Sequence, residues 1–494
     1  MCIRDSLVID ASGNIGASGS ALQTQASSLN LTSRNGAATI ANTSADLDLT
    51  AKASATNGAV TVSQSGNLAV SSVVAKTAVD LSAGGAVTTA ADAVGTAISA
   101  GSLKVAGASI GTSSKALSSQ VAGAVNLTAN AGDINYSNIG AISLLDVLAS
   151  GKIAFQNSGD AVVGQVKAGD TINFKVSGNV TDGNGSAANF ITSGLTAAVK
   201  SFGTSGDALE IQVDNLVIDA ANGGIYARQS NGNLLSLVQA TSGGTGSDIQ
   251  IAADGSIKLG NVDAGGNNVK LSAGGTIEDG RSDKTKANVV ARELDMSAPG
   301  GIGKQGNLDL DVSFLSAAGG SGGVTATNAG AVAVNSSSLT GKGTAAITIV
   351  ATAITVLDNS GGTITMDGGS LTLTATAGNI VFLNQNDTIY LPGGGSITLT
   401  AMNKASSSVP GYDGVIIAGN LKTDGGDITL KAQSNITIGM LDAGNTGNVT
   451  VASAGGVILD GNGTAQNIRG NNVSLTASTP SEHTAEPVSY THLT

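Results

Sequence analysis

The stretch DIQIAADGSIKLGNVDAGGNNVKLSAGGTIEDG, residues 248–280, decides the fold of this chain. Its first half returns in the same register at residues 427–444, as DITLKAQSNITIGMLDAG. Both copies begin with Asp-Ile, alternate apolar and polar residues, and reach a common Asp-Ala-Gly. Because self-similarity at a fixed offset is the signature of stacked repeats, the sequence predicts a repeat architecture.

Two landmarks divide the chain into superunits of about 95 residues. The first is an apolar-Gly pair, followed by a Leu and, four residues after that Leu, by an apolar residue. The four pairs are Ile15-Gly16, Ile110-Gly111, Phe202-Gly203 and Ile302-Gly303, and the later apolar residues are Ala26, Val121, Val213 and Val312. The second landmark, Gly-x-(Ile/Val)-x-Asp-Gly, occurs at residues 178–183, 275–280 and 456–461, with a longer relative, GTITMDG, from Gly362.

The landmarks place superunits near residues 16–110, 111–202, 203–302, 303–400 and 401–478, within one continuous repeat region, residues 7–478. Inside each superunit, apolar and polar residues alternate over short runs such as LNLTS, VNLTA and TINFKV, which is typical of strands. Phe155 and Phe174 fall on the apolar positions of such runs. The run LTAAVK, residues 195–200, is the best candidate for a short helix.

Strands without helical spacers are compatible with a sandwich, a propeller or a parallel β-helix. Small residues suit a narrow interior in which coils stack at about 4.8 Å. Unequal spacing between landmarks is tolerated by a solenoid, which accommodates extra residues as loops. Two-residue hairpin signals are also scarce. We therefore predict an all-β fold, a right-handed parallel β-helix of about twenty coils with roughly 20–25 residues each, with inward Ile, Leu and Val ladders and corners of Gly and Asn.

Composition excludes several classes of function. The net charge of −12 disfavours nucleic acid as a partner, because phosphates need a basic surface. The chain lacks any apolar run of about 18 residues, so the sequence predicts no transmembrane segment. Aromatic residues make up only 2%, and Trp is absent, which sets the chain apart from ordinary compact domains.

The two ends look like translated sequencing adaptor. Met1 to Asp5 can be encoded by a string whose reverse complement encodes Val-Ser-Tyr-Thr-His, the sequence at residues 488–492. We therefore expect residues 1–6 to be an artefact and residues 479–494 to be a disordered tail that ends in adaptor-like residues. The remaining chain is then a cysteine-free fragment of a longer protein.

The units LTANAGDINYSNIG, DMSAPGGIGKQGNLDLDVSFLSA and VKLSAGGTIEDG resemble the repeats of filamentous-haemagglutinin-type adhesins. The resemblance covers roughly residues 7–478. It implies a large bacterial exoprotein with a right-handed parallel β-helix, exported by two-partner secretion or as an autotransporter passenger through an outer-membrane transporter. The Asn-Pro-Asn motifs of that family's secretion domain are not found in this sequence.

A catalytic site has little support in the sequence. His483 is the one histidine outside the adaptor-like ends, so neither a Cys–His dyad nor a histidine-rich zinc site can form. Glu278 and Asp279 are adjacent, and neighbours on a strand point to opposite faces, which argues against a hydrolytic carboxylate pair. The Asp of each Gly-x-(Ile/Val)-x-Asp-Gly copy is better explained as a turn residue.

No cofactor is expected, and calcium is a weak alternative. Asp263 and Asp442, each in an Asp-Ala-Gly sequence, are candidate ligands. Calcium requires six or more oxygens, and the tandem nonapeptide that supplies them in calcium-binding β-helices does not occur in this sequence. A turn aspartate that accepts a bond from its own backbone is the stronger interpretation.

Two insertions are candidate binding loops. Arg281, Lys284 and Lys286 form the densest charge cluster and could contact an acidic glycan, whereas Tyr412, in a Pro/Gly-rich segment, could stack on a sugar or anchor a protein. Ordinary solvated loops are the alternative for both. The sequence thus predicts a secreted or cell-surface bacterial adhesin, non-catalytic, with a glycan or protein receptor. The alternatives are a structural surface-layer or biofilm-matrix protein and, with less support, a polysaccharide-active enzyme.

Overall fold

The computed structural model describes residues 6–335, 339–357, 362–366, 369–403 and 414–478. It is nearly all β, with 58% strand and 1% helix, and its parallel coils stack into a β-solenoid of about 21 turns. The predicted parallel β-helix and its number of coils are thereby confirmed. The chain divides into two compact units, residues 1–231 with 239–244, and residues 232–238 with 245–494.

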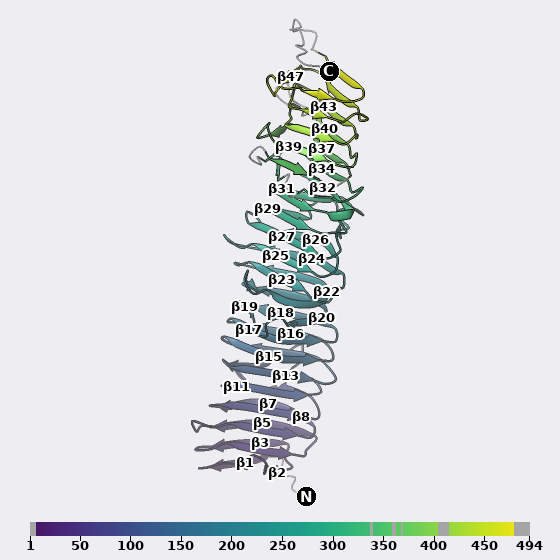
Figure 1. Ribbon diagram of the computed structural model, residues 1–494. Helices are drawn as coiled ribbons and strands as arrows, with labels where there is room; N and C mark the ends of the chain where they lie inside the picture. Colours follow the sequence, from purple (N-terminus) through teal and green to yellow (C-terminus); the bar gives the residue numbers. More distant parts are fainter. Residues whose placement is uncertain (1–5, 336–338, 358–361, 367–368, 404–413, 479–494) are drawn as a thin grey trace. The chain divides into compact units, whose positions relative to one another are not determined.

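In the first unit, each strand lies on the equivalent strand of the previous coil (Figure 1). Its strands are β1 (Ser6–Ala11), β2 (Leu22–Thr24), β3 (Ser28–Ser33), β4 (Ala38–Asn42), β5 (Asp46–Ala53), β6 (Val60–Gln64), β7 (Asn67–Ala75), β8 (Ala78–Ala83), β9 (Val87–Thr89), β10 (Ile98–Ala100), β11 (Ser102–Gly107), β12 (Leu117–Val121), β13 (Ala124–Ala129), β14 (Ile134–Asn138), β15 (Ile142–Ala149), β16 (Ile153–Asn157), β17 (Ala161–Ala168), β18 (Thr171–Val176), β19 (Asn179–Asp182), β20 (Phe190–Val199), β21 (Ser201–Phe202), β22 (Leu209–Ala220) and β23 (Ile225–Gln229).

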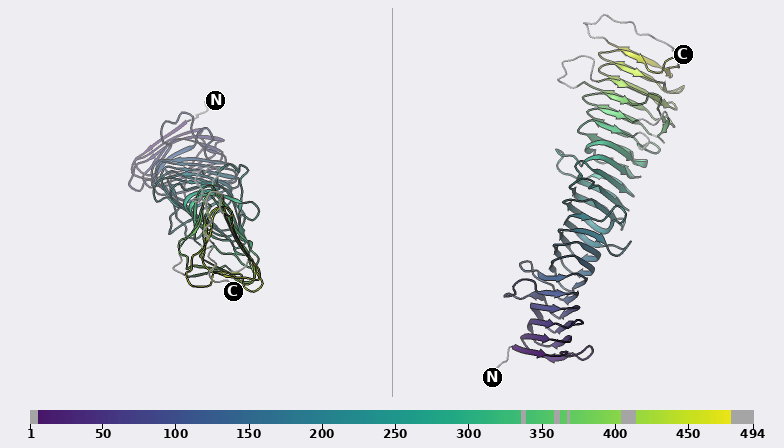
Figure 2. Two further views of the ribbon diagram at one scale, coloured as in Figure 1. Left: turned by 90° about the horizontal axis from the view of Figure 1, so that it is seen from above. Right: turned by 90° about the vertical axis from the view of Figure 1, so that its left-hand side faces the viewer.

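The second unit continues the pattern and, from β34 onward, uses three strands per coil, which give its C-terminal coils the three-sided outline seen in Figure 2. Strand β24 (Leu235–Ser242) contributes residues to both units. The remaining elements are β25 (Ile249–Ala253), β26 (Ile257–Asp263), β27 (Asn268–Ala273), β28 (Thr276–Asp279), β29 (Val289–Ser297), β30 (Gly301–Ile302), β31 (Leu308–Ala318), the 3-10 helix η1 (Gly320–Gly322), β32 (Val324–Asn328), β33 (Val332–Val334), β34 (Ile347–Ala351), β35 (Ile354–Val356), β36 (Thr363–Thr365), β37 (Leu371–Ala375), β38 (Ile380–Phe382), β39 (Thr388–Leu391), β40 (Ile397–Ala401), β41 (Ile416–Ile417), β42 (Asn420–Thr423), β43 (Ile428–Ala432), β44 (Ile436–Ile438), β45 (Leu441–Asp442), β46 (Val449–Ser453), β47 (Ile458–Asp460), β48 (Ile468–Arg469) and β49 (Val473–Ala477).

Like residues stack on like residues in the interior. Ile397 of β40 pairs with Ile428 of β43, and Leu399 pairs with Leu430, all four being buried. The alternate residues Thr398 and Thr429 face outward. Because every coil repeats this alternation, the apolar side chains leave water in continuous rows, which is the main favourable term for folding.

The predicted helix at residues 195–200 is wrong. These residues belong mostly to β20, which pairs with β18 on one side and β22 on the other. Leu195 and Ala197 are buried, whereas Thr196 and Ala198 are exposed, so the segment follows a period of two. Pairing on both edges outweighs the helical preference of this short Ala- and Leu-containing run.

The apolar-Gly landmark marks a coil corner that requires glycine. Gly16, Gly111, Gly203 and Gly303 all have φ between 63° and 69°. A Cβ on any of them would lie 2.1–2.4 Å from a carbonyl oxygen of the next coil. The position therefore excludes every other residue, both by its backbone conformation and by the close approach of the neighbouring chain.

The apolar residue that follows the landmark is held by a buried amide side chain. In each of the four copies of the landmark, an Asn or Gln of the next coil accepts a hydrogen bond from the backbone N–H of that residue, at 2.9–3.1 Å. The four pairs are Asn42 with Ala26, Asn138 with Val121, Gln229 with Val213, and Asn328 with Val312. Each of these N–H groups lies two residues beyond the last pair of the local ladder, so the amide supplies a partner that the ladder does not provide.

Candidate functional site

The Asp of the Gly-x-(Ile/Val)-x-Asp-Gly landmark closes a turn and binds a buried Asn, an arrangement that we call the Asp–Asn frame. In the three copies, Oδ1 of the Asp accepts the backbone N–H two residues later, at 2.8–2.9 Å. The same oxygen accepts a bond from the side-chain amide of an Asn seven or nine residues later. The copies are Asp182 with Asn189, Asp279 with Asn288, and Asp460 with Asn467. The expected turn role of these aspartates is confirmed in these copies, whereas Asp367 of the longer relative lies outside the described residues.

The Asp-Ala-Gly aspartates also close turns. Oδ1 of Asp263 accepts the N–H of Gly265 at 2.9 Å, and Oδ1 of Asp442 accepts the N–H of Gly444 at 3.0 Å. Both bonds match the expected backbone role. Over the described ranges, no three His, Cys, Asp or Glu side chains lie close enough together to hold a metal ion.

In the second copy of the frame, a buried ion pair forms. The Asp279 carboxylate is fully buried, and the Arg281 side chain is only 8% exposed. Arg281 donates to Asp279 through Nε at 3.2 Å and to Asp309 through Nη2 at 2.6 Å, while Lys284 also donates to Asp279. Arg281 thus neutralises the buried carboxylate of Asp279 and the partly exposed carboxylate of Asp309. Its predicted role, in a basic loop that contacts an acidic glycan, stays a prediction that would need this ion pair to open.

Lys286, the third basic residue of this loop, is exposed. Tyr412, the other predicted binding residue, lies outside the described residues, as do most residues of its segment. In the part of the chain that the structure describes, the two predicted binding loops contribute two exposed cations, Lys284 and Lys286. Lys284 also donates a hydrogen bond to Asp279.

The hydrogen bonds around Asp279 control its ionisation. Burial by itself raises the pKa of this carboxyl, but hydrogen bonds from Arg281, Lys284 and Asn288 favour the charged form and hold the pKa well below its usual value. In the first copy of the frame, Glu210 takes the position that Asp309 has in the second copy. The backbone N–H of Glu210 donates to Asn189, just as the N–H of Asp309 donates to Asn288. Burial raises the pKa of Glu210, and the nearby Asp182 adds to the effect.

Replacing Asp279 by Asn is expected to destabilise the fold by about 2 kcal/mol at pH 7, because Arg281 and Lys284 lose a buried charged acceptor. A carboxyl whose pKa is depressed by folding stabilises the protein above its unfolded pKa of about 3.9, and this stabilisation is lost as the pH falls toward the lower folded pKa. The difference between wild type and variant should therefore be largest above about pH 5 and should shrink below about pH 4. Urea unfolding followed by circular dichroism, carried out above about pH 5 and again below about pH 4, measures this difference in stability.

Asp263→Asn is the matched control, because it makes the same exchange in a turn of the same type. The amide oxygen of Asn can accept the bond from Gly265 N–H, so a change below about 0.5 kcal/mol is expected. Equal destabilisation by the two variants would show that the Arg281 ion pair adds nothing beyond the turn.

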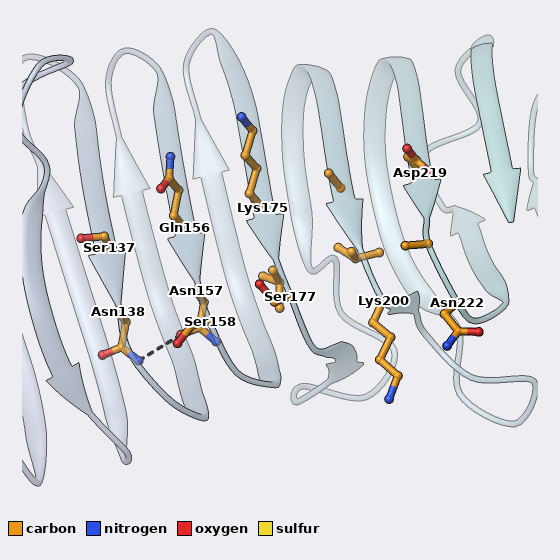
Figure 3. Close-up of a pocket in the computed structure, with 14 residues that line it drawn as sticks. Ser137, Asn138, Gln156, Asn157, Ser158, Lys175, Ser177, Lys200, Asp219 and Asn222 are labelled. Carbon is orange, nitrogen blue, oxygen red and sulfur yellow. Dashed lines mark hydrogen bonds between the residues drawn. The ribbon is translucent and has the colours of Figure 1, made fainter. Parts of the chain in front are cut away.

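In the described part of the first unit, a groove whose lining residues are mostly polar runs across five stacked coils, with a volume of about 830 Å³ (Figure 3). One wall is a single register row, in which each residue pairs with the next. This row consists of Ser137, Gln156, Lys175, Ala198 and Asp219. The second wall comes from the turns that follow the same strands and contains Ser158, Ser177, Lys200 and Asn222.

Nothing in the sequence indicated this groove. Asn138 and Asn157, whose side-chain amides bond to each other at 3.1 Å, line it together with Val176 and Val199 of the next coils. Ala198 and Ala221 also line it, and their short side chains take up little of the space. Only the register between coils shows that these residues share one surface, because they are scattered over more than eighty positions of the chain.

The comparisons with known proteins leave the chain without a family. No family model, curated protein or solved structure matches this sequence or its fold. Within the described residues, no helix has both the length and the apolar character needed to cross a membrane.

Proposed function

We propose that this chain is the passenger region of a secreted or cell-surface bacterial adhesin, in which a non-catalytic β-solenoid presents rows of polar side chains for binding. The observation that carries the proposal is the groove lined by Lys175, Lys200 and the neighbouring polar residues. A solenoid fixes such rows because each outward side chain is spaced from the next by one coil. Binding of this kind requires no cofactor and no movement of the backbone.

The same architecture supports an adhesive role in a second way. Each central strand, such as β16, β18 or β20, pairs in parallel with a neighbouring strand on both sides, so its backbone hydrogen bonds are satisfied. Such strands offer no free edge for indiscriminate strand addition. Specific contacts then come from side chains on the outer surface, which can vary without disturbing the buried ladders.

The direct test uses beads coated with the full chain. They are offered to epithelial cells, to bacterial cells and to immobilised extracellular matrix, with albumin-coated beads as the control. Adhesion above the albumin control on at least one of these surfaces is expected. Adhesion equal to that control on all three would overturn the proposal. Self-assembly of the chain into filaments or sheets with no adhesion, measured by sedimentation, would instead favour a structural matrix protein.

A further inference from the structure

The groove is positively charged relative to the chain that carries it. The whole sequence has a net charge of −12, yet the charged residues in the lining are Lys175, Lys200 and Asp219. Both lysines are exposed, and Figure 3 shows them pointing in opposite directions from the groove, one from each wall. An anionic ligand that covers the groove and extends over both walls can therefore meet a cation on either side.

The backbone around the groove excludes a peptide bound by strand addition. The strands of the first wall, β14, β16, β18, β20 and β22, pair with one another in succession. The three central strands are consequently paired on both edges, and their N–H and C=O groups are already used. An extended peptide gains much of its affinity from such backbone groups. The groove instead offers hydroxyls, amides and ammonium groups from side chains.

These groups suit a linear carbohydrate. Gln156, Ser158, Ser177 and Asn222 supply donors and acceptors for sugar hydroxyls, and they recur from coil to coil along the groove. Adjacent coils are about 4.8 Å apart, a spacing comparable to the length of one sugar ring in an extended chain. A polymer laid along the groove would therefore present similar groups to successive coils.

We propose that the groove binds a linear acidic polysaccharide, with a carboxylate group at Lys175 or Lys200, which lie on adjacent coils, and sugar hydroxyls on the neighbouring amides and hydroxyls. This assignment rests on the proposed adhesive function and names the class of ligand. Two lysines among mostly uncharged lining residues match a sparsely charged polymer, in which uronic acids alternate with neutral sugars. A densely sulfated chain would place several further negative charges against uncharged side chains and Asp219.

The test measures binding of the full chain to hyaluronan, a linear polymer with one carboxylate per disaccharide, and to neutral dextran by surface plasmon resonance. Hyaluronan should bind and dextran should not. The double variant Lys175→Gln/Lys200→Gln should bind hyaluronan about tenfold more weakly, as expected for the loss of two exposed charge contacts. Ser177→Trp, which fills the groove and leaves its charge unchanged, should reduce binding at least as much.

Each variant has a matched control. Lys52→Gln/Lys167→Gln removes the same charge from exposed positions outside the groove. Ser54→Trp places the same ring at an exposed serine that also follows a strand and donates its N–H to the coil below, as Ser177 does. Both controls should bind hyaluronan as the wild type does. Hydrogen exchange of each variant verifies that the coils remain folded.

Three results would overturn the inference. These are equal binding of hyaluronan and dextran, equal losses in the groove variants and their controls, and no binding of hyaluronan by the wild type. If coated beads still adhere to cells in any of these cases, the ligand assignment fails while the adhesive function stands. If the beads do not adhere although hyaluronan binds, the adhesive function fails and the groove assignment stands.

Discussion

Replacing Gly203 by Ala is expected to destabilise the first unit by about 3 kcal/mol. Gly203 has φ of 69°, a conformation that costs an L-residue about 1–2 kcal/mol. The new Cβ would also lie 2.4 Å from the carbonyl oxygen of Tyr226, so the next coil must shift, at a further cost of about 1–3 kcal/mol. Because solenoid coils stabilise one another as neighbours, we expect the loss to be strongest in the coils on either side.

Hydrogen–deuterium exchange of peptides spanning residues 190–230, together with urea unfolding, measures this effect. Gly206→Ala is the matched control in the same loop, since a Cβ there has no atom within 4 Å. This variant should leave the free energy of opening, measured by hydrogen exchange, unchanged to within about 0.5 kcal/mol. Protection of residues 209–229 in Gly203→Ala at the wild-type level would show that the corner relaxes without strain.

Phe174→Ala should cost about 4 kcal/mol, the range measured for deletion of a buried aromatic ring. Phe174 is fully buried and is the central member of a stack of five rings inside the first unit. Its ring centroid lies 4.7 Å from that of Phe155 and 5.1 Å from that of Phe190. The outer members are Tyr136 and Phe202. Removing the central ring leaves a cavity between Phe155, which stacks on Phe174, and Phe190, which meets it edge-on.

Urea unfolding monitored by circular dichroism measures this loss, and Phe314→Ala provides the control. Phe314 is 39% exposed, so the same truncation there should cost less than about 1 kcal/mol. Phe174→Leu separates volume from aromatic contact, because it keeps most of the apolar bulk. A cost as large as that of Phe174→Ala would mean that ring stacking, not cavity formation, dominates at this position.

The interior of the solenoid was predictable because it depends on local alternation. The register of Ile397 with Ile428 follows from two runs with the same period, and Phe155 and Phe174 were placed in the interior by that period alone. The glycine landmark was also visible, since a unique backbone conformation admits only one residue type. The helix expected at residues 195–200 failed because a short run cannot reveal that both edges of its strand are paired.

The polar contacts between coils were not predicted from the sequence. Asn42 and Gln229 look like ordinary polar residues at strand ends, although each holds a backbone group one coil away. Their constant distance from the landmark residues Ala26 and Val213 was a usable signal that pattern matching on apolar residues misses. The contact of Arg281 with Asp309 was also missed, because only the register between coils brings these two residues together.

One position of the Asp–Asn frame differs in residue type among the three copies, whereas the Asp and the Asn are present in all of them. Asn184, Arg281 and Asn462 each donate a backbone N–H to the same aspartate, yet their side chains differ in charge and reach. Asn462 bonds to the carbonyl of Gln466 in its own turn, Asn184 bonds to Ala188 and to the carbonyl of Gly164 in the previous coil, and Arg281 reaches Asp309 in the next coil. The turn therefore accepts different side chains at this position, because only the backbone N–H of the residue takes part in the turn. A repeat protein built this way can acquire or lose a link between coils by a single exchange, with no new backbone.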